Sequence, residues 1–174
     1  MILAVDVAYF ENVAIAGGVF FESWDSEKIL YESVCRVDGV ASYIPGNFFL
    51  RELPCIKKLL EKNSIKIDCI VIDGYVTLGV DQLPGLGMKL WEDIGGKIPI
   101  IGVAKTGFFG TPENTKIYRG NSSKPLFITT VGIKLDDAKY NILKMKGKFR
   151  IPDFLKAVDH LSRKAISQGG INSI

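Results

Sequence analysis

The sequence is poor in the residues that build zinc and disulfide sites. Its 174 residues include one histidine, His160, and three cysteines, Cys35, Cys55 and Cys69. A single histidine excludes a zinc site made of several histidines. The cysteines are odd in number, lack metal-type spacing and lie among apolar residues, so we expect buried core thiols.

Long hydrophobic runs and a strong charge imbalance are also absent. No apolar stretch approaches the roughly 18 residues of a membrane-spanning helix. The net charge of +3 permits a nucleic-acid partner without singling one out. The N-terminal MILAVDVAYF has no basic leader and carries Asp6 among apolar residues, so we interpret it as a buried strand. We therefore expect a cytoplasmic protein outside the membrane.

The chain shows no repeat, low-complexity segment or linker, which favours one domain over residues 1–168 and a flexible tail over residues 169–174 that begins at two glycines. A monomer is the working expectation. Basic residues crowd the C-terminal third, and they fit a phosphate-binding surface and a solvated helix and turn equally well: Lys139, Lys144, Lys146, Lys148 and Arg150.

The first half begins with strands. Residues 2–8, 13–21 and 28–37 are rich in β-formers and separated by short polar stretches, which predicts an antiparallel meander. Apolar residues then recur at helical spacing from residue 48 to 63, after Pro45-Gly46 has interrupted the chain. A helix is expected there.

The second half alternates strands and helices. Nearly unbroken apolar runs at 67–73 and 98–104, with a helix over 84–94 between them, predict a parallel crossover. A strand at 125–131 precedes a helix that starts at Asp136-Asp137 and ends near Lys146, and the last helix starts beside Pro152-Asp153. This order predicts an α/β fold with a ribonuclease-H-like mixed sheet, three antiparallel strands and then parallel strands, and helices on both faces. A flavodoxin-like layout shares much of this order.

Two aspartates occupy places where a charge is costly. Asp6 lies inside the first apolar strand, and Asp73 closes the strand that contains Ile70-Val71-Ile72. A desolvated carboxylate must be paired, hydrogen-bonded or bound to a cation. If the two strands are neighbours, both carboxylates converge on one point and suit Mg²⁺, which prefers oxygen ligands. A turn-forming or helix-capping role is the alternative for Asp73.

Three further charged residues are candidates for the same site. Glu52 lies early in the first long helix, where a partner of the helix dipole is its ordinary role. Asp159 borders the apolar stripe of the last helix and is otherwise a surface carboxylate. Lys105 ends the strand at 98–104, where it either neutralises a phosphate or reaches solvent.

Four segments in this order resemble the endonuclease V family: AVDVAY at 4–9, YIPGNFFLRELP at 43–54, VIDG at 71–74 and IGVAKT at 101–106. The resemblance covers about residues 2–164. It implies a ribonuclease-H-like fold and Mg²⁺-dependent cleavage, with Mn²⁺ as a substitute, of DNA or RNA near a deaminated base, inosine.

The resemblance also implies roles for individual residues. Asp6 and Asp73 match metal-binding aspartates, Glu52 and Lys105 match the catalytic glutamate and lysine, and Asp159 matches a position facing the metal. A strand-parting wedge and a pocket for a flipped base match the remaining positions: Tyr43, Ile44, Pro45 and Gly46 for the wedge, and Gly46, Phe48 and Gly74 for the pocket.

Departures from the family pattern leave alternatives open. YVTLGVDQLPGLG, which follows Gly74, contains no histidine where the family usually has one, and TTVGI at 129–133 replaces a polar turn. These changes leave the carboxylates intact and alter the base pocket. The rival hypothesis is a catalytically weak or inactive nucleic-acid-binding relative, and a third is a module that binds no nucleic acid.

Overall fold

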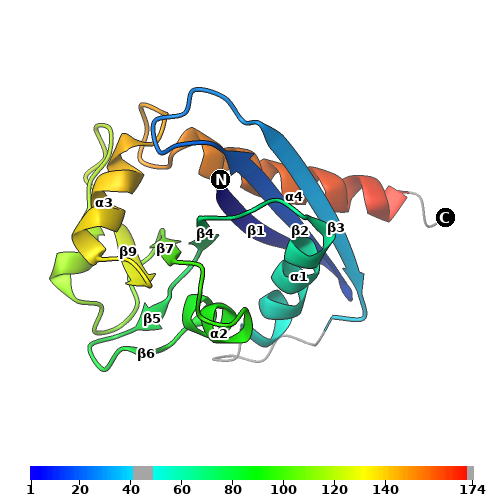
Figure 1. Cartoon of the computed structure of the whole chain (residues 1–174), viewed down its shortest axis with the longest axis horizontal. Helices are drawn as coiled ribbons and strands as arrows, with labels where there is room; N and C mark the ends of the chain where they lie inside the picture. Colours follow the sequence, from blue (N-terminus) through cyan, green and yellow to red (C-terminus); the bar gives the residue numbers. More distant parts are fainter. Residues whose placement is uncertain (41–48, 172–174) are drawn as a thin grey trace.

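One mixed β-sheet forms the centre of the molecule (Figure 1). The computed structural model describes residues 1–40 and 49–171, and these contain a seven-stranded sheet in the order β3-β2-β1-β4-β7-β9-β8. Its strands are β1 (Ile2–Phe10), β2 (Val13–Phe21), β3 (Tyr31–Asp38), β4 (Cys69–Asp73), β7 (Ile100–Ala104), β8 (Lys116–Ile117) and β9 (Leu126–Val131). A hairpin of β5 (Thr77–Leu78) and β6 (Leu83–Pro84) lies outside this sheet.

The strand directions give the mixed pattern that the sequence predicts. Strands β1, β2 and β3 pair antiparallel, as a meander requires. Strands β1, β4 and β7 run parallel, so the predicted crossover between β4 and β7 is confirmed. Strand β9 runs antiparallel to β7 and to β8, so the expectation that the strands after the meander are all parallel is wrong for β9. The ribonuclease-H-like arrangement is therefore the observed one.

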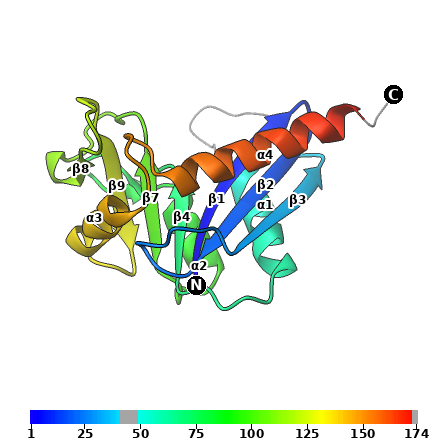
Figure 2. The same ribbon diagram turned by 90° about the horizontal axis from the view of Figure 1, so that it is seen from above.

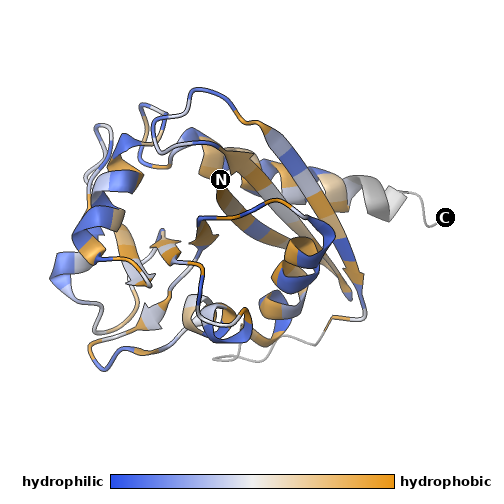
Figure 3. Cartoon of the chain, viewed as in Figure 1, coloured by the Kyte–Doolittle hydropathy of each residue, from blue (hydrophilic) through white to orange (hydrophobic). Residues whose placement is uncertain are grey.

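Helices cover both faces of the sheet (Figure 2). Helices α3 (Leu135–Lys144) and α4 (Asp153–Ile171) pack on one face, and α1 (Phe49–Lys62) and α2 (Leu86–Asp93) pack on the other. Residues of β1 alternate between the two cores: Ile2 and Ala4 face α3 and α4, whereas Leu3 and Val5 face α1 and α2. Because both faces are covered, the central strands are apolar on both sides (Figure 3).

Some predicted boundaries are wrong. Helix α2 begins at Leu86, and not at residue 84, because Pro84 pairs with Thr77 in the hairpin. Helix α4 continues to Ile171 through the two glycines at which we expected a tail to begin. A glycine costs a helix only about 1 kcal/mol relative to alanine, so a long helix can continue through two of them. The hairpin, β8 and a 3₁₀ turn at Glu113–Thr115 were not predicted.

Gly17 allows α4 to lie close against the sheet. A Cβ atom at this position would be 3.2 Å from the backbone nitrogen of Ser162 and 3.3 Å from the carbonyl oxygen of Val158. Gly17 is also the partner of Asp6 in the β1–β2 ladder. The missing side chain therefore brings α4 next to the residue that the sequence marks as a metal ligand.

Two expectations from composition can be compared with the structure. All three cysteines are buried and free, as predicted for core thiols. None of the helices in the described part of the chain combines the length and apolar character needed to cross a bilayer.

Candidate active site

Asp6 and Asp73 lie at the same end of two neighbouring strands. Val5 of β1 is aligned with Ile72 of β4 in a parallel ladder, and the two aspartates follow this pair. The strand alternation directs both side chains to the face that α4 covers, since Ala4 and Val71 belong to the core on that face. The prediction that the two strands are neighbours is confirmed.

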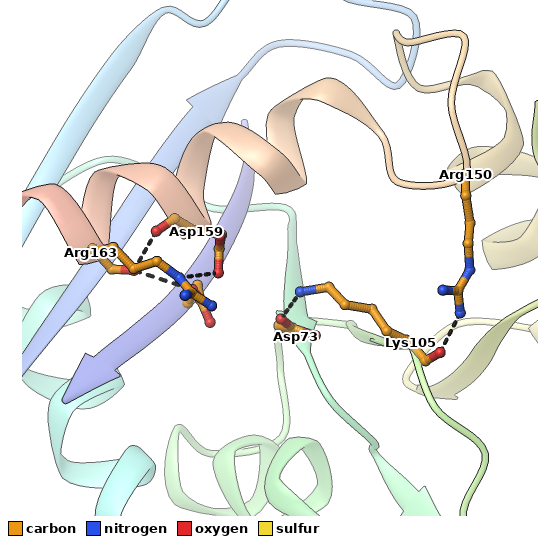
Figure 4. A network of polar contacts seen from close by, with 7 residues as sticks. Asp73, Lys105, Arg150, Asp159 and Arg163 are labelled. Atoms are coloured by element: carbon orange, nitrogen blue, oxygen red, sulfur yellow. Dashed lines mark hydrogen bonds and ion pairs between the residues drawn. The ribbon is translucent and has the colours of Figure 1, made fainter.

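Lys105 extends this arrangement across the third parallel strand. It follows β7 directly, where Val103 is aligned with Asp73. Its Nζ forms an ion pair with Oδ2 of Asp73, as Figure 4 shows. Both side chains remain about one-third exposed, at 39% and 33%, so solvent or a ligand can reach the pair.

Helix α4 adds three polar residues from above the sheet. Asp159, which the sequence predicted, lines the same pocket as Asp6 and Asp73. Ser162 is fully buried, and its single hydroxyl hydrogen is shared between Oδ2 of Asp6 at 3.2 Å and the carbonyl oxygen of Asp159 at 3.0 Å. Arg163 Nε donates to Oδ1 of Asp159 at 2.9 Å (Figure 4). Ser162 and Arg163 were missed, although their spacing of three and four residues from Asp159 places them on one helix face.

Glu52 approaches the site from α1. Only 5% of it is exposed, and it is the acidic residue in the first turn of α1. It lies close enough to Asp6 and Asp73 for both charges to affect its pKa. Beside it, the buried hydroxyl of Tyr9 has no hydrogen bond of ordinary geometry to any described residue, and the Arg51 guanidinium lies 4.1 Å from the Tyr9 ring centroid.

The carboxylates repel one another electrostatically. Burial raises the pKa of Asp6, and the nearby Asp73 and Asp159 raise it further, while Lys105 and the Ser162 hydroxyl act in the opposite direction. Burial also raises the pKa of Glu52 well above its ordinary value, with Asp6 and Asp73 as the next causes. A pocket of about 350 Å³ opens beside this cluster and is lined by Asp6, Asp73 and Asp159. Concentrated negative charge in an open pocket is suited to a bound cation.

The arrangement of possible ligands limits how a cation can be held. Within residues 1–40 and 49–171, no three His, Cys, Asp or Glu side chains group closely enough to share one ion. Two aspartates at adjacent strand ends still offer oxygen ligands, and Mg²⁺ is commonly bound by one or two carboxylates together with water and substrate phosphate. The donor chemistry fits a hard divalent cation that completes its shell with these groups.

The other predicted site residues lie either beside Asp73 or outside the described residues. Gly74 follows Asp73 with φ of +150°, a conformation that favours glycine. The proposed wedge and pocket residues Tyr43, Ile44, Pro45, Gly46 and Phe48 lie outside the described residues. His160, the single histidine of the chain, is exposed.

Part of the basic C-terminal cluster is engaged locally. Lys144 and Lys146 form ion pairs with Asp25 and Glu27, at 3.4 and 2.9 Å. These contacts favour the reading of a solvated helix and turn for the two lysines. Arg150 differs from them, because its guanidinium donates to the carbonyl oxygen of Lys105 (Figure 4).

Comparison with known proteins gives consistent matches. The family model described as Endonuclease V matches residues 1–141. An endonuclease V from Pyrococcus abyssi is 34% identical over 168 residues, covering 96% of this chain and 81% of the relative. The matched family range ends before α4, whereas this relative covers nearly the whole chain.

Solved structures match over the same length. The endonuclease V of Streptomyces avermitilis aligns with a TM-score of 0.77 and 27% identity, covering 97% of this chain and 82% of the other. The endonuclease V of Ciona intestinalis, solved with a 23mer DNA containing an inosine followed by a ribo-adenosine, aligns with a TM-score of 0.77, 18% identity and coverage of 96% and 85%. At that identity the likeness shows a shared fold.

Proposed function

Since the chain belongs to the endonuclease V family, we propose that it is a metal-dependent endonuclease that hydrolyses a phosphodiester near a deaminated base, inosine, in DNA or RNA. Membership of the endonuclease V family supports nuclease activity for this chain. The observation that carries the finer proposal is the convergence of Asp6 and Asp73 at adjacent strand ends, with Lys105 paired to Asp73.

Mg²⁺ is the proposed cofactor, with Mn²⁺ as a substitute. We assign Asp6 and Asp73 as its protein ligands, and Glu52 and Asp159 as carboxylates beside it that contact it through water. When bound, the cation supplies an activated water and stabilises negative charge on the phosphate. Ser162 holds Oδ2 of Asp6 by a hydrogen bond at 3.2 Å, which restricts how this ligand can turn.

Lys105 and Glu52 have different proposed roles. Lys105 carries a partly exposed ammonium group, and a phosphate oxygen entering the pocket would give it a second anionic partner, so it stabilises charge on the phosphate. Glu52 has a raised pKa because it is buried near Asp6 and Asp73. Without a cation it therefore holds a proton more tightly than an ordinary glutamate, and beside a bound cation its carboxylate helps to bind the ion or to orient the attacking water.

Inosine is proposed as the lesion on two grounds. The Ciona intestinalis relative of the same fold was solved with inosine-containing DNA, and the segment from Tyr43 to Gly46 matches the family wedge. Phe48 and Gly74 belong to the proposed base pocket. The missing histidine after Gly74 predicts a lesion preference weaker than that of a family member that keeps it.

The test is cleavage of a labelled inosine-containing oligonucleotide with Mg²⁺, with and without Asp6→Asn. We expect the wild type to nick the strand and the variant to lose all measurable nicking. Asp68→Asn is the matched control, because Asp68 adjoins the opposite end of β4 and its side chain is 59% exposed. Equal nicking by wild type and Asp6→Asn would contradict the assigned site.

A second candidate is a nucleic-acid-binding relative with weak or no turnover. It is favoured by the lack of a three-ligand group among the described residues. Gel shifts with inosine and plain oligonucleotides, run beside the cleavage assay with Mg²⁺ or Mn²⁺, separate the two. Tight binding without cleavage in either metal supports the second candidate.

The cytoplasm is the proposed compartment. Cys35, Cys55 and Cys69 are all free and buried, and unpaired thiols are typical of reducing surroundings. Fractionation of cells that express a tagged chain tests this assignment, and a membrane or extracellular signal would contradict it.

A further inference from the structure

Arg150 contacts the main chain at the residue that carries the site ammonium. It lies in the segment between α3 and α4, and its Nη2 donates to the carbonyl oxygen of Lys105 (Figure 4). The same nitrogen donates to the carbonyl oxygen of Pro125 at 2.6 Å. One guanidinium nitrogen thus bridges two strands of the sheet where both lie next to the site.

The two hydrogen bonds of Arg150 lie where the backbone hydrogen bonds between β7 and β9 end. The last β7–β9 pair is Ala104 with Phe127, so Lys105 lies one residue beyond the ladder. On the opposite strand Pro125 has no backbone N–H to donate. Arg150 supplies hydrogen atoms to two carbonyls that the ladder leaves without strand partners, and it fixes the backbone at Lys105.

A second arginine holds the segment that carries Arg150. Arg119 is only 6% exposed. Its Nη1 donates to the carbonyl oxygen of Phe149 at 3.0 Å, and its Nη2 donates to those of Met145 and Gly147, the latter at 3.3 Å. These hydrogen bonds hold the main chain on both sides of residue 148. They therefore fix the position of the backbone from which the Arg150 side chain extends.

We propose that Arg150 is a positioning residue that sets the direction of Lys105 toward Asp73 and thereby the rate of strand cleavage. Arg150 forms no hydrogen bond or ion pair with Asp6 or Asp73, and it acts through the main chain of Lys105. The inference rests on the proposed nuclease function. It extends the site to a loop outside the residues matched by the family model, which end at 141.

The experiment compares Arg150→Met, Arg150→Lys and Arg150→Ala with wild type in single-turnover cleavage of the inosine oligonucleotide at saturating protein. Misplacement of a reacting group by about 1 Å costs on the order of 100-fold in rate. We therefore expect a loss of about 10- to 100-fold for Arg150→Met and a smaller loss for Arg150→Lys, which keeps the charge. The dissociation constant of the oligonucleotide should change little in the lysine variant.

Chemical rescue distinguishes positioning from a general structural role. Guanidinium ion, at a concentration that does not unfold the protein, should restore part of the Arg150→Ala rate, whereas sodium ion at equal ionic strength should not. Arg36→Met is the matched control, since Arg36 pairs with Asp38 at 2.8 Å on the surface of β3. It should cleave at the wild-type rate.

Hydrogen exchange measured without substrate tests the positioning role of Arg150 independently of cleavage activity. Amides following Lys105 should exchange faster in Arg150→Met than in wild type or Arg36→Met. Unchanged exchange together with an unchanged cleavage rate would overturn the positioning role. A wild type that does not cleave inosine strands would instead overturn the proposed function, and the exchange data would still decide whether Arg150 holds residue 105.

Discussion

Replacing Gly17 with alanine tests whether the close approach of α4 builds the site. A Cβ atom there would lie 3.2 Å from Ser162 N and 3.3 Å from Val158 O, both backbone atoms of the helix, so α4 must shift by a few tenths of an ångström. Overpacking costs about 1–3 kcal/mol, and the loss of unfolded-chain entropy offsets about 0.4–1 kcal/mol of this. We expect a net destabilisation of about 1 kcal/mol.

The shift should affect activity more than stability. The hydrogen bond from Ser162 Oγ to Asp6 Oδ2 is already 3.2 Å long, beyond the usual range of about 2.5–3.0 Å for two oxygen atoms. Moving the helix outward would break it and free Asp6 to turn. Loss of a hydrogen bond that orients a metal ligand costs about 10- to 100-fold in metal affinity or activity, so we expect Mg²⁺-dependent nicking to fall about tenfold at limiting Mg²⁺.

Gly18→Ala is the matched control. Its Cβ would meet Leu59 Cδ2 at 2.9 Å and Leu3 Cδ1 at 3.1 Å, which are the ends of flexible side chains on the opposite face of the sheet. Urea unfolding and single-turnover nicking at a series of Mg²⁺ concentrations should show destabilisation in both variants and reduced nicking only in Gly17→Ala. Equal nicking by the two variants would refute the reasoning.

Three further predictions follow from the site. Ser162→Ala should raise the Mg²⁺ concentration needed for half-maximal nicking by about tenfold without moving the helix, and an unchanged Mg²⁺ titration would exclude the orienting role. Mg²⁺ should raise the melting temperature of the wild type but not of Asp6→Asn, because a ligand that binds only the native state stabilises it; a shift of equal size in both proteins would place the ion elsewhere. Glu52 has a folded-state pKa raised well above 4.5, so without metal its contribution to stability is retained below pH 4.5 and is lost as pH rises toward the folded-state pKa. Glu52→Gln should therefore be more stable than wild type at neutral pH and lose this advantage in acid, as urea unfolding at both pH values would show.

Long elements and buried charges were the predictable part of this molecule. Strand β2 occupies Val13–Phe21, the predicted residues, because no polar or charged side chain interrupts it and valine, isoleucine and phenylalanine stand at both ends. Asp6 and Asp73 were identifiable because each interrupts or closes an apolar strand, where an unpaired carboxylate is expensive. Strand β9 was identified with the wrong direction, since LFITTV suits a parallel and an antiparallel neighbour equally well.

Contacts between distant single residues were not predictable. Ser162 reaches Asp6 across 156 positions and Arg150 reaches Lys105 across 45, and neither pairing leaves a periodic pattern in the sequence. The β5–β6 hairpin was missed because strands of two residues carry no periodicity. The roles of Tyr43, Ile44, Pro45, Gly46 and Phe48 remain predictions from the family resemblance.

The hydrogen bond between Ser162 and Asp6 ties almost the first residue of the fold to almost the last. A chain emerging from the ribosome would carry Asp6, Asp73 and Lys105 long before α4 is synthesised. Until that helix docks on Gly17, Asp6 lacks both its serine partner and Asp159 beside it. An unfinished or prematurely terminated chain should therefore be a poor nuclease, and truncation before residue 153 should abolish cutting while β1, β4 and β7 remain encoded.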